Sequence, residues 1–441
     1  MVGVEVGIAS VFIILILIYT GIHVAVALGL VSFVGVWIYK DSINIAISLL
    51  AEATHDTVAH AVFANVPLFA LMGIIASEIG LGADVYKVAD QAFRRVRGGL
   101  GMATVAANAL FASITGSSIA SASVFTRIAV PEMLRFGYTR PFSVGVVAGS
   151  SVLGMLIPPS AMLIIYAIIA ETSVGDMFIA GFIPGIVLAA AFVGGIVLMS
   201  YFAPQFIGGS AQRIAENGED DAPHMGVGEI ARLMFPVGLL VLMVLGGIYS
   251  GWFTPEEAGA AGSLGALIIG VAKRRLTWHG LWRVLTETGH ITAAILFLII
   301  AASMYSRMLG VAGLPTSFSE WLTSMHLGLH HMMAIYIVLM VLLGTIIETA
   351  SIILIVVPLF LNSVQALGGD IVWFGIVTVI GAEIGLLTPP LGISCFTIKS
   401  TIKDPSITLA HIFAGAFPFA CIMLLVLILI VAFPWLSLAL L

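Results

Sequence analysis

Long apolar runs separated by short polar segments make up most of the sequence. A membrane-spanning helix needs roughly 17 to 25 mainly apolar residues, and many of the runs are about this long. The pattern therefore predicts an all-α polytopic membrane protein. Its expected spans lie at about 4–20, 22–39, 60–80, 141–172, 178–202, 233–250, 254–272, 290–306, 371–400 and 409–436.

Two further apolar segments, about 99–126 and 332–363, are interrupted by polar residues near their centres. The first contains SITGSSIASAS at 113–123, with six hydroxyl side chains in eleven positions, and the second contains GTIIETASIIL at 344–354. Non-helical backbone at membrane depth is tolerated where protein or a cavity surrounds it. We therefore predict that each segment is a re-entrant hairpin, which enters and leaves the membrane on the same face.

The basic residues support this prediction. With both hairpins in place, fifteen of the 17 Lys and Arg residues fall on one side of the membrane, and only Lys40 and Arg307 fall on the other. The positive-inside rule assigns the basic side to the cytoplasm and both termini to the outside. If either hairpin were instead a full span, the basic residues would no longer be concentrated on one side of the membrane. The residues on the basic side are Lys87, Arg94, Arg95, Arg97, Arg127, Arg135, Arg140, Arg213, Arg232, Lys273, Arg274, Arg275, Arg283, Lys399 and Lys403.

A duplicated Pro-Pro pair relates the two halves of the chain. Pro158-Pro159 lies in GSSVLGMLIPPSAMLIIYAII, and Pro389-Pro390 lies in GAEIGLLTPPLGISCFTIKST. Adjacent prolines remove two backbone donors and clash with the preceding turn, so each long span must break into two half-helices. Each broken span follows one of the predicted hairpins.

The same order of elements occurs twice: two spans, an amphipathic stretch (41–58 or 274–288), one span, a hairpin, a broken span and a final span. The first copy enters the membrane from outside and the second from inside, so the prediction is an inverted repeat. Residues 1–207 form its first half, and residues 230–441 its second. The polar segment 208–229 joins them as a cytoplasmic linker, and Glu219, Asp220 and Asp221 are expected to be solvated there rather than to bind a metal.

Inverted repeats with paired discontinuous helices are typical of secondary transporters, which hold substrate and coupling ion where the half-helices meet. Free carbonyls and hydroxyls at the hairpin tips suit Na⁺, whereas half-helix N-termini suit a carboxylate. Small residues are also enriched wherever membrane helices pack, so any one tip serine could serve packing alone. The residues at the two tips are Thr115, Gly116, Ser117 and Ser118, and Glu348, Thr349 and Ser351.

Three charged residues near the hairpins and breaks have more than one interpretation. Glu348 and Glu383 are intramembrane carboxylates and therefore functional candidates, able to take a proton, pair with a cation or cap a half-helix. Arg127 follows the first hairpin and could attract an anion, but a purely topogenic role explains it equally well.

Composition excludes several other classes. Only 9% of the residues are charged and mean hydropathy is +1.16, and both values lie far outside the range of soluble globular proteins. The two cysteines, Cys395 and Cys421, have no disulfide or zinc-site spacing. The basic residues form no nucleic-acid patch, and neither a Walker A pattern nor an HExxH motif occurs. The N-terminal run lacks a basic n-region, so we expect it to remain as a helix rather than to be cleaved.

Three motifs resemble the large membrane subunit of tripartite ATP-independent periplasmic (TRAP) transporters: GSSIASASVFTRIAVPEMLRFGY (116–138), GSSVLGMLIPPS (149–160) and GLLTPPLGISCF (385–396). The resemblance implies an elevator-type secondary transporter, not an enzyme, in a bacterial or archaeal cytoplasmic membrane. It also implies Na⁺-coupled uptake of a small organic anion delivered by a periplasmic solute-binding protein. A small four-span membrane subunit is expected as a separate polypeptide, and no cofactor beyond Na⁺.

Carried over to this chain, the resemblance implies one sodium site between the first tip and the first break, and a second between the second tip and the second break. The implied ion-binding residues are Gly116, Ser117, Ser118, Ser150, Ser151 and Pro158, with Thr349, Ser351, Gly381, Thr388 and Pro389. The substrate-binding candidates are Thr115, Glu348, Pro159 and Pro390.

An alternative of similar architecture is a proton-coupled carrier or Na⁺/H⁺ antiporter, in which Glu348 or Glu383 would titrate. The sequence does not identify the substrate.

Overall fold

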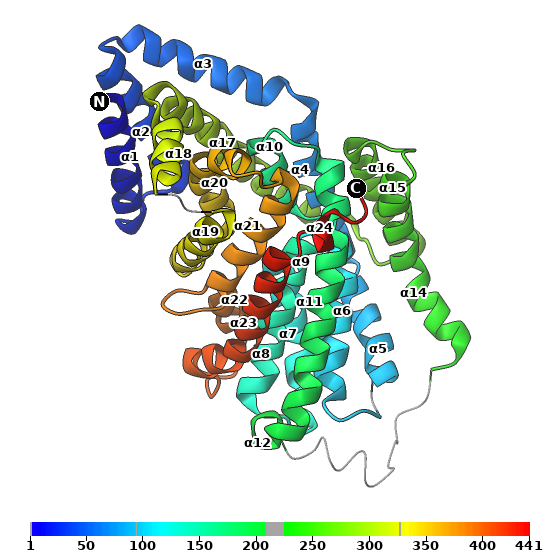
Figure 1. The fold of residues 1–441 in the computed structure, drawn as a ribbon. Coiled ribbons are helices and arrows are strands. Elements are labelled where there is room, and N and C mark those ends of the chain that lie inside the picture. Colours follow the sequence, from blue (N-terminus) through cyan, green and yellow to red (C-terminus); the bar gives the residue numbers. More distant parts are fainter. Residues whose placement is uncertain (1, 94, 209–224, 326–327) are drawn as a thin grey trace.

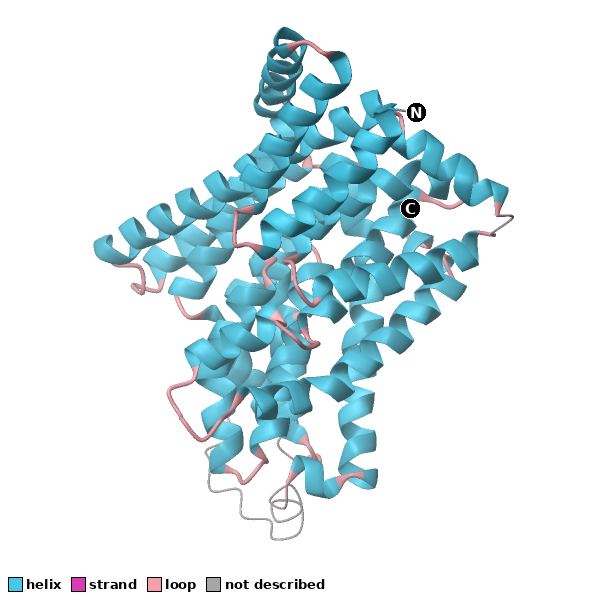
Figure 2. Cartoon of the chain, turned by 90° about the vertical axis from the view of Figure 1, so that its left-hand side faces the viewer, coloured by secondary structure: helices cyan, strands magenta, loops and turns pink. Residues whose placement is uncertain are grey.

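The computed structural model describes residues 2–93, 95–208, 225–325 and 328–441, and every regular element in these ranges is a helix (Figures 1 and 2). This confirms the predicted all-α polytopic fold. Most of the predicted linker, including Glu219, Asp220 and Asp221, lies outside the described residues.

The first half begins with two apolar helices, a peripheral helix and a helix that descends into the molecule (Figure 1). A short amphipathic helix, the first hairpin, the broken span and a long helix follow. In chain order these are α1 (Val2–Tyr19), α2 (Val24–Lys40), α3 (Ile43–Ala59), α4 (Asn65–Glu78), α5 (Leu81–Phe93), the hairpin α6 (Gly99–Thr115) and α7 (Ser118–Arg135), the broken span α8 (Arg140–Ser151), α9 (Leu153–Leu156) and α10 (Ala161–Ile169), then α11 (Val174–Phe202) and the short α12 (Pro204–Ile207).

The second half repeats this order. Its elements are α14 (Val227–Val241), which continues through a π-helical turn (Leu242–Gly246) into α15 (Gly247–Tyr249), then α16 (Pro255–Ala272), α17 (Trp278–Ala312) and α18 (Leu314–Ser324), the hairpin α19 (Leu329–Gly344) and α20 (Thr349–Ala366), the broken span α21 (Ile371–Leu386) and α22 (Ile393–Thr401), then α23 (Leu409–Ala432) and α24 (Trp435–Leu438).

Helix length and hydropathy agree with most of the predicted spans. Within the described ranges, six helices are long and apolar enough to cross a membrane, and the first broken span, bent by 44°, makes a seventh. One of the six is α20, an arm of the second hairpin. The helices α1, α2 and α21 are apolar but shorter. The broken spans explain part of the difference between the predicted spans and these helices, because a break leaves each half-helix too short to cross the membrane alone.

The two halves differ in the amphipathic stretch before the hairpin. In the first half, α3 ends at Ala59, a short 3₁₀ turn follows, and α4 begins separately. Pro67 in the first turn of α4 explains the break, because its ring would clash with a helix arriving from α3. In the second half no proline intervenes, so the predicted stretch 274–288, from residue 278 on, and the span 290–306 form the single 35-residue helix α17.

The two halves pack into one body through close contacts between helices. A Cβ atom on Gly145 of α8 would lie 2.2 Å from the carbonyl of Gly415 in α23, so these helices meet backbone to backbone. On α5, the buried carboxylate of Asp84 binds both Lys273 at 2.8 Å and Arg275 at 2.7 Å. Both termini lie in the upper part of Figure 1 and α12 lies at the bottom.

Candidate functional site

The tip of the first hairpin is formed by residues whose local chemistry favours a tight turn. Gly116 adopts a left-handed conformation with φ of +57° directly after α6, a position that favours glycine. Ser117 is the N-cap of α7, and its Oγ accepts a hydrogen bond from the Ala120 N–H at 3.3 Å. The dense hydroxyl patch in the sequence is therefore the point at which one half-helix ends and the next begins.

The first tip lies against the backbone of the first break. The Ala161 N–H at the start of α10 donates to the Gly116 carbonyl at 3.4 Å. A Cβ on Gly154 would lie 3.0 Å from the carbonyl oxygen of Ser117, and a Cβ on Gly73 of α4 would lie 2.8 Å from that of Thr115. Backbone carbonyls from the tip and the break thus gather in one small region.

The hydroxyls predicted to form the first ion site have different environments. Ser150 Oγ donates to the Val146 carbonyl and Ser151 Oγ to the Ala148 carbonyl, so both bond back to their own helix. In the described part of the chain, Ser118 Oγ and the Asn108 side-chain oxygen are buried without a hydrogen-bond partner. A buried polar atom without a partner is costly, so these two oxygens are the ones available to a ligand here.

Two more buried hydroxyl groups on α7 lack a hydrogen-bond partner in the described part of the chain. Ser121 and Thr126 also bury a hydroxyl without a partner among the described residues, further from the tip.

The tip of the second hairpin is held by the second break in the same way. The Thr345 carbonyl accepts hydrogen bonds from the N–H groups of Leu391 at 3.1 Å and Gly392 at 3.4 Å. Gly344 at the end of α19 and Gly385 of α21 approach so closely that neither has room for a side chain. Each hairpin tip therefore contacts the break of its own half.

A buried carboxylate lies directly behind the second tip. Glu383 of α21 is 1% exposed, and its Oε1 accepts a hydrogen bond from Thr349 Oγ1 at 2.7 Å. Its Oε2 and the hydroxyl of Ser394 in α22 are buried with no partner in the described ranges. Glu383 stood out in the sequence as an intramembrane carboxylate, but it was outside the implied ion-binding set. Asn108 and Ser394 gave no signal beyond being polar residues in apolar helices.

The other residues implied at the second site are placed less favourably. Thr388 Oγ1 donates to the Gly385 carbonyl at 2.9 Å, and Gly381 packs against Met340. Ser351 donates to the Glu348 carboxylate at 3.1 Å. Pro389 and Pro390 are exposed, whereas Pro158 and Pro159 are buried.

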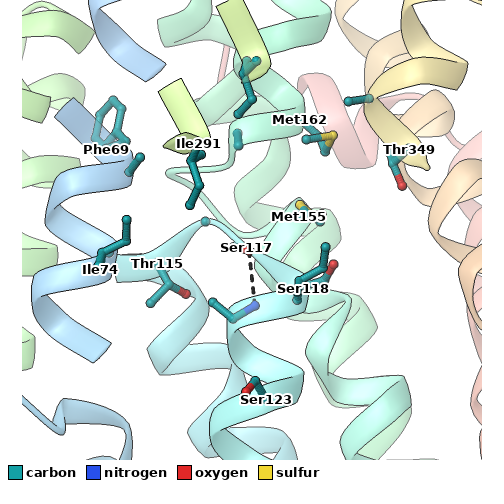
Figure 3. Close-up of a pocket in the computed structure, with 18 of the residues that line it drawn as sticks. Phe69, Ile74, Thr115, Ser117, Ser118, Ser123, Met155, Met162, Ile291 and Thr349 are labelled. Carbon is teal, nitrogen blue, oxygen red and sulfur yellow. Dashed lines mark hydrogen bonds between the residues drawn. The ribbon is translucent and has the colours of Figure 1, made fainter. Parts of the chain in front are cut away.

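The two tips share one cavity of about 770 Å³, which α4, α10, α17 and α22 also line. Figure 3 shows Ser117 and Ser118 between Phe69 on one side and Thr349 on the other. Of the sequence-predicted residues, Thr115, Gly116, Ser117, Ser118, Pro159, Glu348 and Thr349 line this cavity. Ser150, Ser151, Pro158, Ser351, Gly381, Thr388, Pro389 and Pro390 are outside its lining.

The charges around the cavity are unevenly compensated. Among the described residues, Arg127 is the only Lys or Arg in the lining, which also contains Glu78, Glu287 and Glu348. Glu78 is ion-paired with Arg283, whereas Glu287 and Glu348 form no ion pair in the described part of the chain. No group of three or more His, Cys, Asp or Glu residues within the described ranges could hold a metal ion by side chains alone.

Helical hairpin tips, broken helices and a shared cavity are typical of polytopic membrane transport proteins. Residues 11–436 match the family described as "Tripartite ATP-independent periplasmic transporter, DctM component". The chain therefore belongs to the TRAP transporter large membrane subunits, as the sequence motifs indicated. Family membership makes it a permease rather than an enzyme, and implies association with a small membrane subunit and a periplasmic binding protein.

Individual relatives agree with this assignment. The C4-dicarboxylate TRAP transporter large permease protein DctM of Pseudomonas aeruginosa is 34% identical over 422 residues, covering 94% of this chain and 93% of that protein. The sialic acid TRAP transporter large permease protein SiaM of Vibrio cholerae is 29% identical and covers 85% of each chain. The crystal structure of the YdaH transporter of Alcanivorax borkumensis matches with a TM-score of 0.63 over 90% of both chains, at 14% identity, which shows a shared fold.

Proposed function

We propose that this chain drives Na⁺-coupled uptake of a small organic anion, a carboxylate, across a bacterial cytoplasmic membrane. A periplasmic binding protein delivers the anion, and a separate four-span subunit completes the membrane complex. The body that carries both hairpins moves against the remaining helices in an elevator-like step. Each net positive charge carried inward gains about 2.3 kcal/mol per 100 mV, so a small excess of Na⁺ over substrate charge concentrates the substrate without ATP.

The observation that carries the proposal is that both hairpin tips line one cavity, each with an unpartnered buried oxygen behind it. These oxygens are Ser118 Oγ at the first tip and Glu383 Oε2 at the second. Hydroxyl, carboxylate and carbonyl oxygens are hard ligands suited to Na⁺. The N-termini of α7 and α20, which face the same cavity, offer N–H groups and positive dipole ends to a carboxylate.

The charge balance of the cavity also favours coupling to a cation. Glu287 and Glu348 outweigh the single guanidinium of Arg127 in the lining, and the buried Glu383 adds a third carboxylate close by. An organic anion entering alone would be repelled. Cations bound at the two tips would neutralise the carboxylates and make substrate binding depend on the ions.

The position of the cavity supports release to the cytoplasm. His23 and Ser77 of the lining lie close to helix ends that the basic residues assign to the cytoplasmic side, and Arg127 lies midway along α7, which runs toward that side. The structure therefore corresponds to an inward-facing state in this proposal.

A proton-coupled carrier is the second candidate, and one observation favours it. Glu383 is a buried carboxylate with no cationic partner among the described residues, and such a group in a membrane protein is a candidate proton carrier.

The test is uptake into proteoliposomes that contain the permease, its small subunit and the binding protein. Labelled succinate and labelled sialic acid are natural first substrates, because two relatives are named for these classes. An imposed inward Na⁺ gradient should drive uptake at equal pH. Uptake that ignores Na⁺ and follows a pH gradient would overturn the proposal in favour of the second candidate.

A further inference from the structure

One face of α7 lines the cavity for more than two helical turns below the tip. Ala120, Ser123, Val124 and Arg127 are all in the lining. Their spacing of three, four and seven residues places them on one stripe of the helix. Figure 3 shows Ser123 below Ser117 and Ser118, further along α7 from the tip. Arg127 extends the same stripe by one more turn.

The facing helix presents hydroxyls to the same part of the cavity. Thr397, Ser400 and Thr401 of α22 line it, again at spacings of three and four residues, and α22 packs against α7. These hydroxyls donate to carbonyls of their own helix, Thr397 to Ile393 and both Ser400 and Thr401 to Thr397. They make this end of the cavity polar, while the guanidinium of Arg127 supplies the free donors that recognise a carboxylate.

Arg127 is free to bind a ligand. It is exposed, and no ion pair or hydrogen bond engages it within the described part of the chain. Three other arginines are engaged: Arg283 pairs with Glu78, Arg275 with Asp84, and Arg135, two turns further along α7, with Glu132 at 3.7 Å. The guanidinium of Arg127 therefore keeps its donors free for an anion that enters the cavity.

We infer that Arg127 is a specificity-determining residue that binds a carboxylate of the transported anion, with Ser123 and the α22 hydroxyls around it. The inference rests on the proposed uptake of an organic anion and names the group that recognises it. Arg127 is nine residues beyond Ser118, or about 13 Å along the helix axis, and long helical side chains lean back toward the N-terminus. The substrate class is therefore an extended organic acid, with its carboxylate at Arg127 and a second polar or anionic end at the tips.

The electrostatic part of the inference can be tested without knowing the substrate. Ser123→Cys, in a background without Cys395 and Cys421, places a thiol one turn from Arg127. The measured quantity is the ratio of its labelling rates with anionic sulfonatoethyl and cationic trimethylammonium-ethyl methanethiosulfonates. The charge of Arg127 over one helical turn in water speeds the anionic reagent and slows the cationic reagent by about fourfold each, so Arg127→Gln should lower the ratio by about sixteenfold.

Matched variants make this result decisive. Arg127→Lys should keep most of the ratio, since it keeps the charge. Arg135→Gln removes the same charge from the same helix outside the cavity lining, and should leave the ratio unchanged. A ratio that stays within twofold in Arg127→Gln would show that the guanidinium does not act on the cavity, and would overturn the inference.

Substrate recognition is tested by uptake in the same proteoliposomes, with whichever of succinate or sialic acid the unmodified protein transports better. Losing a hydrogen-bonded charge should raise KM by about tenfold or more in Arg127→Gln, with a smaller change in maximal rate. A KM unchanged by the substitution, with Na⁺-driven uptake intact, would overturn the inference alone. If the unmodified protein shows no Na⁺-driven uptake of either acid, the proposed function fails, while the labelling ratio still decides whether Arg127 sets the charge of the cavity.

Discussion

Replacing Glu383 by Gln is expected to separate Na⁺ coupling from proton coupling. Glu383 Oε1 accepts a hydrogen bond from the Thr349 hydroxyl, and the buried Oε2 has no partner among the residues that the structure describes. A Gln side chain has nearly the same shape and retains one oxygen that can accept from Thr349. The substitution therefore removes a charge and one oxygen ligand, while the hydrogen bond that joins α20 to α21 can persist.

The expected effect on Na⁺ binding is large. Two unit charges about 4 Å apart at an effective dielectric constant of 20 interact with about 4 kcal/mol, close to a thousandfold in affinity. We expect the Na⁺ concentration that half-saturates uptake to rise by roughly 100-fold or more in Glu383→Gln. The measurement is initial uptake rate against Na⁺ concentration in proteoliposomes, at constant pH and ionic strength.

Thr349→Val is the matched control, because it keeps the carboxylate and removes its hydrogen-bond donor. The negative charge that attracts the ion remains in this variant, so half-saturating Na⁺ should change less than in Glu383→Gln. A half-saturating concentration in Glu383→Gln within threefold of the unmodified value would refute Glu383 as a Na⁺ ligand. If Glu383→Gln instead abolishes uptake driven by a pH gradient and leaves Na⁺ dependence intact, Glu383 is the proton carrier of the second candidate.

Two other predictions concern the first tip. Ser118→Ala should raise the half-saturating Na⁺ concentration for uptake about tenfold, because it removes a hydroxyl that has no partner among the described residues. Ser151→Ala should change that concentration less than twofold, because the Ser151 hydroxyl already donates to its own helix. Equal shifts in the two variants would contradict the assignment of Ser118 as a Na⁺ ligand. Gly154→Ala should lower the thermal unfolding midpoint in detergent, because the new Cβ would lie 3.0 Å from the Ser117 carbonyl and overpacking costs about 1 to 3 kcal/mol. A Cβ on Gly194 would have no described atom within 4 Å, so Gly194→Ala should leave the unfolding midpoint unchanged or raise it. An equal fall of the midpoint in both variants would show that the close contact at the tip does not matter for stability.

The hairpins could be predicted from sequence because the same residues that interrupt the apolar runs also favour turns and caps. Gly116 followed by Ser117 is a helix end followed by an N-cap, and the structure places both residues in these roles. The break in the first half was equally predictable, since adjacent prolines cannot continue a helix. These features are local, and a local sequence determines them.

Side-chain partners across the fold could not be predicted in the same way. Ser118 and Ser151 are both small hydroxyl residues in the motifs that resemble the family, yet one is unpartnered and the other bonds back to its helix. The two Pro-Pro pairs have the same local chemistry, but the first pair is buried and the second is exposed. Burial depends on which helices pack over a segment, and no short motif contains that information.

Arg127 shows how the two kinds of information combine. Charge bias alone explained a basic residue after the first hairpin tip, and helical spacing alone placed it midway along α7 on the stripe of Ser123. Only the packing of α22 against α7 shows that this stripe faces a cavity rather than lipid or another helix. The topogenic and functional roles are then compatible, because α7 runs toward the side that the positive-inside rule assigns to the cytoplasm, and the proposed inward-facing state would release its anion on that side. A carboxylate moving from the tips to the cytoplasm would pass Arg127 last, so a weaker contact there should speed release while it lowers affinity.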